Sequence, residues 1–148
     1  MRIDCKVWPL QKPNPAFPKE TFSWVPVLKV KLIHKHSPPT KWFECIVDSG
    51  SEVCIFHADV CKSLGIRKVE SGIKNTLGGV IGGATGLMYY HKVKIIIGSE
   101  RIETMAGFSP QLSVAGILGR RGFFENFTVK FDASEHPPFL EVERVYRA

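Results

Sequence analysis

The chain has 148 residues, a length that suits one domain with its own hydrophobic core. Hydrophobic residues make up 44% and charged residues 23% of the sequence, which is near the soluble globular average and excludes disorder of the whole chain. The net charge of +6 comes from scattered basic residues with no nucleic-acid-binding motif beside them, so we expect solvated faces and no nucleic-acid partner.

The first 24 residues are predicted to form a loosely structured N-terminal arm, because four prolines oppose a regular helix and interrupt sheet pairing. The aromatic side chains in this arm are expected to hold it against the rest of the chain. Residues 25–148 are predicted to form one domain, since no later segment has the composition of a linker.

A hairpin is predicted after the arm. Apolar residues alternate with lysines over 27–33, which is typical of a strand with one solvated face, and a second apolar strand is predicted over 42–47. This second strand leads directly into Asp48. Two short elements are predicted next, a strand over 53–56 and a helix over 58–64 that ends at Gly65.

A second hairpin is predicted around a glycine-rich tip, with strands over 74–80 and 87–97. Glycine and proline are frequent, with 13 and 10 residues, and so many turn formers favour β structure over long helices. The last strand is expected at an edge or an interface. The elements predicted after the hairpin are strands over 101–108, 114–118, 127–132 and 139–146, with a helical turn over 121–126.

The cysteines and the N-terminus favour a reduced, cytoplasmic protein. No Cys-x-x-Cys pair is present, and Cys45, Cys54 and Cys61 lie in apolar runs, where they are expected to act as small core residues. The first residues lack the apolar run of a signal peptide, and no stretch approaches the length of a membrane span. Among the histidines only His34 and His36 are closely spaced, and a solvated pair is a simpler interpretation than a zinc site.

Two short motifs carry the chemical interpretation. Asp48-Ser49-Gly50-Ser51 closes an apolar strand, and Ile117-Leu118-Gly119-Arg120 follows much later in the chain. Together they resemble the retropepsin-like aspartic proteases, most closely the stand-alone prokaryotic members, over roughly Val27 to Asp132. The resemblance implies an all-β, closed and mostly antiparallel barrel with short helices.

The resemblance also implies a homodimer. Peptide hydrolysis by carboxylates needs two of them, one ionised to activate water and one protonated to donate to the scissile carbonyl. The chain has four aspartates, and only Asp48 precedes a Ser-Gly pair, so the second carboxylate would come from a second copy across a twofold axis. An aspartic endopeptidase that acts on extended peptides, with no metal or organic cofactor, is therefore expected.

The same resemblance implies roles for the neighbours of Asp48. Gly50 would turn the backbone and hold the carboxylate through its amide, and Ser49 would bond across the dimer axis. The Ser51 hydroxyl would donate to Asp48 and, by favouring the ionised form, give an acid pH optimum. Structural support is expected from Gly119 and from an ion pair between Glu52 and Arg120.

The glycine-rich tip resembles the flap of these proteases, which opens to admit substrate and closes to exclude water. Its backbone would pair with an extended peptide as an added strand. A phosphate-binding loop is the competing interpretation, but no Gly-Lys-Ser/Thr is present. The expected substrate-binding residues are Gly79, Val80, Ile81, Gly82 and Gly83.

Three alternatives remain open at the level of sequence. The same fold could serve as a catalytically silent, dimeric protein-binding module, because an intact Asp-Ser-Gly does not prove turnover. A nucleic-acid-associated protein that uses the positive charge is a weaker alternative. Ser49 or Ser51 as a nucleophile would need an oriented histidine base, and His57 is too close in sequence to be persuasive.

Overall fold

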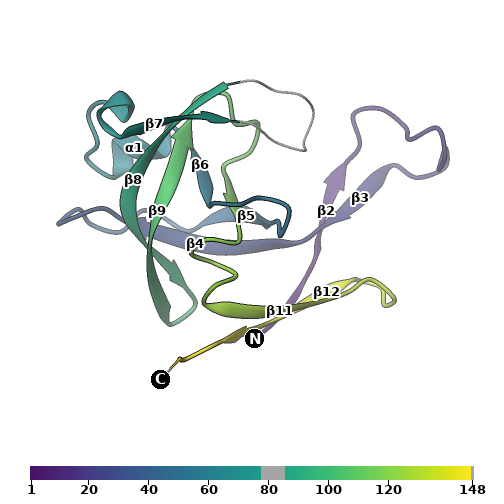
Figure 1. Ribbon diagram of the computed structural model, residues 1–148. Coiled ribbons are helices and arrows are strands. Elements are labelled where there is room, and N and C mark those ends of the chain that lie inside the picture. The colour runs from purple at the N-terminus through teal and green to yellow at the C-terminus, as the bar shows by residue number, and fades with distance from the viewer. Residues whose placement is uncertain (78–85, 148) are drawn as a thin grey trace.

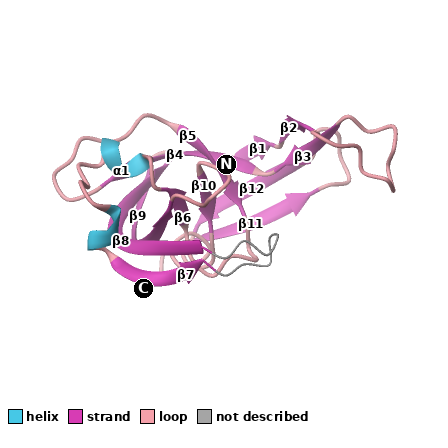
Figure 2. Ribbon diagram, turned by 90° about the horizontal axis from the view of Figure 1, so that it is seen from above, coloured by secondary structure: helices cyan, strands magenta, loops and turns pink. Residues whose placement is uncertain are grey.

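The computed structural model describes residues 1–77 and 86–147 (Figure 1). These residues are almost entirely β structure, with one short α-helix and one 3-10 turn (Figure 2). The elements are β1 (Arg2–Asp4), β2 (Lys6–Pro9), β3 (Phe22–Val25), β4 (Val27–Ile33), β5 (Phe43–Val47), β6 (Ile55–His57), α1 (Val60–Ser63), η1 (Val69–Ser71), β7 (Ile73–Leu77), β8 (Gly86–Ile97), β9 (Glu100–Ser109), β10 (Gly116–Leu118), β11 (Phe127–Asp132) and β12 (Phe139–Arg144).

The largest sheet closes on itself. Its strands follow the order β4, β5, β10, β6, β9 and β8, and β8 pairs back with β4, while β7 adds to the outer side of β8. The β5–β10 and β6–β9 pairs are parallel, and the other pairs in this ring are antiparallel. The expected all-β, closed, mostly antiparallel barrel with short helices is confirmed, and it is consistent with a retropepsin-like fold.

The barrel interior is filled by alternate residues of its strands. On β4, Leu28, Val30 and Leu32 are buried, whereas Lys29 is exposed and Lys31 is half-buried, as the two-residue period of a strand requires. Large aromatic side chains from β6 and β9 meet at the centre, where the rings of Phe56 and Phe108 lie 5.7 Å apart. The core position expected for three cysteines is confirmed, since Cys45, Cys54 and Cys61 are all buried.

A smaller sheet joins the two ends of the chain in the order β1, β12, β11. The strand expected for the C-terminal tail is confirmed as β12, but it lies in the middle of this sheet and not at an edge. Phe139, Leu140 and Val142 of β12 are buried, and β1 and β11 pair with its two edges.

The N-terminal arm is more regular than expected. β2 and β3 pair as an antiparallel hairpin around the proline-rich segment 10–21, and β1 before them belongs to the sheet with β12. Pro13, Pro15 and Pro18 lie within the connecting segment, and Pro9 pairs with Phe22 at the last position of β2, so the strands can form on either side. The hairpin projects from the barrel on the side opposite α1 (Figures 1 and 2).

The helical turn expected over 121–126 is present only in part. Hydrogen-bonded turns cover 122–126, and the amide of Phe127 donates to the carbonyl of Phe123 at 3.0 Å, but Gly122 has a φ of 92°, which keeps it out of a helix. The helix expected over 58–64 is confirmed as the shorter α1, and Gly65 follows it with a φ of 70° as the left-handed terminator. Within the described residues, no helix is both long and apolar enough to cross a membrane.

Candidate active site

The candidate site is the turn that follows β5. The backbone amide of Asp48 donates to the carbonyl oxygen of Leu118 at 3.0 Å, which continues the pairing of β5 with β10. The amide of Gly50 donates to Oδ1 of the Asp48 carboxylate at 2.8 Å, as the sequence predicted. A Cβ on Gly50 would lie 3.0 Å from that same oxygen, so a larger residue there would push the carboxylate out of this position.

β10 crosses between the strands on either side of the turn and holds it in place. A Cβ on Gly116 would lie 2.6 Å from Sγ of Cys45 on β5 and 2.8 Å from the Phe56 ring on β6. After β10, the amide of Arg120 donates to the Ser51 carbonyl at 2.9 Å, and that of Arg121 donates to the Glu52 carbonyl at 2.8 Å. The turn is therefore fixed by backbone bonds from a second segment.

Ser51 differs from its expected role. Its hydroxyl donates to the carbonyl oxygen of Val53 at 2.7 Å and not to the Asp48 carboxylate. The amide of Ser51 donates to the carbonyl oxygen of Asp48 at 3.2 Å, which closes a turn. The Ser51 side chain follows this turn and reaches Val53, two residues later. Ser49 is exposed at the tip of the turn, where a second protein copy could reach it.

The arginine that pairs with Glu52 is not the expected one. Nε of Arg121 lies 3.3 Å from Oε1 of Glu52, whereas NH1 of Arg120 donates to the carbonyl oxygen of Ser49 at 2.7 Å. The reason is the register of the two segments, because the backbone of Arg121 already bonds to that of Glu52. Arg120 thus bonds directly to the Asp48 turn, at Ser49.

The other aspartates lie elsewhere in the described residues. The amide of Asp59 donates to Nδ1 of His57 at 3.1 Å, so this histidine is held by its own neighbour in sequence. Asp132 accepts bonds from the hydroxyl and the amide of Ser134, and these donors hold the pKa of Asp132 below its ordinary value. Asp4 lies exposed on β1. In residues 1–77 and 86–147 no group of three or more His, Cys, Asp and Glu side chains is placed to hold a metal ion.

The base of the glycine-rich hairpin is held by two residues that the sequence analysis missed. The buried hydroxyl of Ser109 donates to the carbonyl of Leu87 at 2.6 Å, and the amide of Leu87 donates to Oε1 of Gln111 at 3.3 Å. The expected flap residues lie outside the described part of the chain, namely Gly79, Val80, Ile81, Gly82 and Gly83. Ser109 ends a strand with alternating polarity, and no pattern marks its hydroxyl as buried.

A small apolar cluster joins the turn to this hairpin. Val53 from the segment after the Asp48 turn, Ile55 from β6 and Met88 from β8 are buried together. Leu77, Tyr90 and Leu112 pack against them and are only partly buried. The cluster provides apolar surface between the Asp48 turn and the strands of the hairpin, and Leu112 was not predicted to take part.

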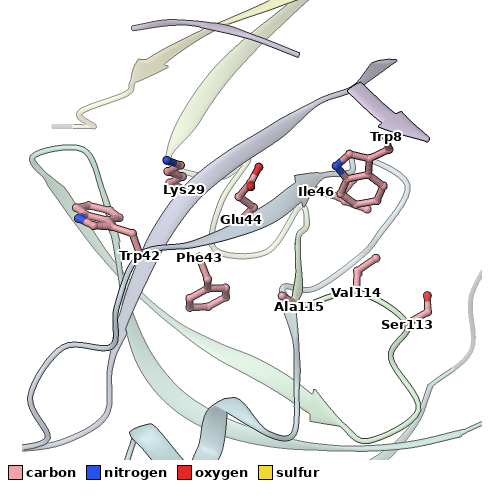
Figure 3. Close-up of a pocket in the computed structure, with 9 residues that line it drawn as sticks. All are labelled: Trp8, Lys29, Trp42, Phe43, Glu44, Ile46, Ser113, Val114 and Ala115. Atoms are coloured by element: carbon pink, nitrogen blue, oxygen red, sulfur yellow. The ribbon is translucent and has the colours of Figure 1, made fainter. Parts of the chain in front are cut away.

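A groove of about 530 Å³ lies on the outer wall of the barrel, between that wall and the β2–β3 hairpin (Figure 3). Lys29 and Glu44 lie within it, and Trp8 of β2 lies over Ile46 of β5 (Figure 3). It is distinct from the Asp48 turn, which follows the end of β5. The groove is lined by Trp8, Lys29, Trp42, Phe43, Glu44, Ile46, Ser113, Val114 and Ala115.

No known family model matches the chain, and no curated protein matches it in sequence. Among solved structures, that of EIAV protease complexed with the inhibitor HBY-793 is similar to this chain. The sequences are 18% identical, the likeness covers 65% of this chain and 82% of that one, and the TM-score is 0.45. A likeness of this degree carries no function over to the present chain.

Proposed function

We propose that this chain is an aspartic endopeptidase that works as a homodimer, with Asp48 of each copy as the catalytic residue. The proposal is carried by one observation, the Asp48 carboxylate held over the turn at the end of β5 by the Gly50 amide. Backbone bonds from Arg120 and Arg121 brace that turn, so the carboxylate has a fixed position at the surface. A fixed, accessible carboxylate is the arrangement that acid-base catalysis requires.

The chemistry explains why a second copy is needed. One carboxylate must be ionised to take a proton from water, and the other must be protonated to donate to the scissile carbonyl oxygen. Two carboxyl groups a few ångströms apart favour this shared single proton, because ionising both is costly. The other three aspartates of the chain lie on β1, beside His57 and at the end of β11. A twofold axis beside Asp48 supplies the missing partner.

An extended peptide fits the surroundings of the turn. The β7–β8 hairpin adjoins the apolar cluster of Val53, Ile55 and Met88, which would accept apolar side chains of the substrate. Peptides that bind beside a strand take main-chain bonds for affinity and alternate side-chain pockets for specificity. The four free, buried cysteines suit a reducing compartment, and we place the reaction in the cytoplasm.

The test is cleavage of a mixed peptide library between about pH 3 and about pH 8, read by mass spectrometry. The wild-type protein should cleave peptides with an optimum on the acid side, and Asp48→Asn should abolish cleavage. Asp59→Asn is the matched control, because Asp59 is exposed and bonded to His57, and it should retain activity.

Equal turnover by wild type and Asp48→Asn would contradict the proposal, since the activity would then come from another source. A dimer that cleaves no peptide at any pH would also contradict it and would favour the silent protein-binding module.

A further inference from the structure

The β2–β3 hairpin has two different faces. Residues directly opposite each other in an antiparallel pair point to the same side, and residues two apart along a strand share that side. The pairs Val7–Trp24 and Pro9–Phe22 therefore lie on one face. The pairs Lys6–Val25 and Trp8–Ser23 lie on the other.

The face with Lys6 and Trp8 is occupied by the chain's own barrel. Nζ of Lys6 lies 2.9 Å from Oε2 of Glu44 on β5. Trp8 lines the outer groove together with Ile46, and it points back toward the barrel wall (Figure 3). These contacts attach this face of the hairpin to the barrel.

The opposite face, which we call the open face, consists of Val7, Pro9, Phe22 and Trp24. Every one of these residues is apolar, and Val7 and Phe22 are 48% and 39% exposed. The rings of Phe22 and Trp24 meet edge to face at 5.4 Å, which gives the surface a rigid aromatic centre. Contiguous exposed apolar surface of this kind, on a projecting element, is typical of a protein-binding site.

The position of the hairpin indicates what binds there. The amide of Val47 donates to the carbonyl of Pro26 at 2.9 Å, and Val27 pairs with Ile46. Because β4 and β5 are antiparallel, the chain preceding Pro26 runs out past the end of β5, where Asp48 follows. β3 therefore leaves the barrel beside the active-site turn, and the hairpin extends beyond it (Figure 1).

We infer that the open face of the hairpin binds a second copy of this chain. The inference rests on the proposed function, because a second copy that supplies its Asp48 must approach the same turn from which the hairpin projects. A twofold axis there would place the hairpin of each copy against the other, so that the contact occurs twice in the dimer. The arm would thus hold together the two halves of one active site.

The test measures the dimer dissociation constant by sedimentation equilibrium for the wild type and for Phe22→Ser. Removing an aromatic anchor from a buried contact should raise the dissociation constant about tenfold or more. Met105→Ser is the matched control, because Met105 is 41% exposed on β9 of the barrel and should leave the constant unchanged.

A second measurement needs no variant. Amide hydrogen exchange of the wild type is compared at protein concentrations above and below the dimer midpoint. The amides of residues 22–25 should exchange more slowly in the dimer, whereas exposed amides of the barrel should not change.

The outcomes separate this inference from the proposed function. Dimers that cleave peptide but are unaffected by Phe22→Ser, with no change in exchange, overturn the role of the arm and leave the protease proposal intact. Arm-dependent dimers without peptide cleavage support the role of the arm and overturn the protease. A chain that stays monomeric at every concentration overturns both proposals. If the amides of residues 22–25 exchange more slowly only when a peptide substrate is added, and not on dimerisation, the second copy is the wrong partner for the open face.

Discussion

A Cβ atom on Gly119 would lie 2.2 Å from the carbonyl oxygen of Val53 and 2.6 Å from its carbonyl carbon. The backbone after β10 therefore touches the backbone of the segment that follows the Asp48 turn, with no room for a side chain. Neither partner is a flexible side chain that could move aside. Gly119 lets two segments far apart in the sequence form the hydrogen bonds that fix the Asp48 turn.

Gly119→Ala should destabilise the protein by about 3 kcal/mol or more, since the added methyl group forces two backbones apart. Gly65→Ala is the control, because no atom lies within 4 Å of its added Cβ and only the φ of 70° is unfavourable. That control should cost about 1 to 2 kcal/mol. Urea unfolding of the two variants gives the comparison, and an equal loss of stability would contradict the close approach.

The neighbouring arginines should behave differently. Arg120→Gln removes the bond from NH1 to the Ser49 carbonyl and should lower kcat about tenfold, because small displacements of a catalytic group are costly. Arg121→Gln breaks an ion pair whose side chains are 65% and 67% exposed, and activity should stay within about twofold. Steady-state kinetics on one cleaved peptide distinguishes them, and a larger loss in Arg121→Gln would reverse the assignment.

Ser51→Ala should leave the pH optimum of cleavage unchanged. The hydroxyl donates to the carbonyl of Val53 and not to the Asp48 carboxylate. Its loss should therefore lower the free energy of unfolding by about 1 kcal/mol and leave the pH dependence of cleavage as it is. Ser113→Ala, at an exposed position, is the control for stability. An optimum that moves upward in Ser51→Ala would mean that the hydroxyl reaches the Asp48 carboxylate in the assembled dimer.

The cysteines should be unreactive in the folded protein. Burial disfavours the thiolate and raises the pKa of Cys45, Cys54 and Cys5, and it raises the pKa of Cys61 to about 11. Because these folded-state values lie above neutral pH, a disulfide reagent at about pH 7.5 should modify the thiols only after unfolding. Rapid modification of the native protein, followed by absorbance, would contradict this.

Much of the fold follows from residues that are adjacent in sequence. The alternation of Val30 and Leu32 with lysines predicts β4, and the glycine after α1 predicts where that helix ends. The bond from Gly50 to Asp48 spans two residues, so the motif itself is enough to predict it. Such local patterns predict strands from their two-residue period and turns from the position of glycine.

The contacts that differ from prediction depend on register between distant segments. Glu52 pairs with Arg121 and not Arg120 because backbone bonds between the two segments set which arginine faces it, and a shift of one residue exchanges the two. The bond between Ser109 and Leu87 joins two strands through a hydroxyl that no local pattern marks as buried. The hairpin of β2 and β3 was missed because Pro13, Pro15 and Pro18 lie between the strands and Pro9 lies at the end of β2, so the prolines leave the paired residues free.

The most direct test of the central claim is to mix wild type with Asp48→Asn at constant total protein and to measure total peptide cleavage after the subunits exchange. If each active site needs Asp48 from both copies, only dimers with two wild-type chains are active. An equal mixture should then retain roughly one quarter of the wild-type activity. Retention of roughly one half, with activity proportional to the wild-type fraction, would show that each chain acts alone and would contradict the account.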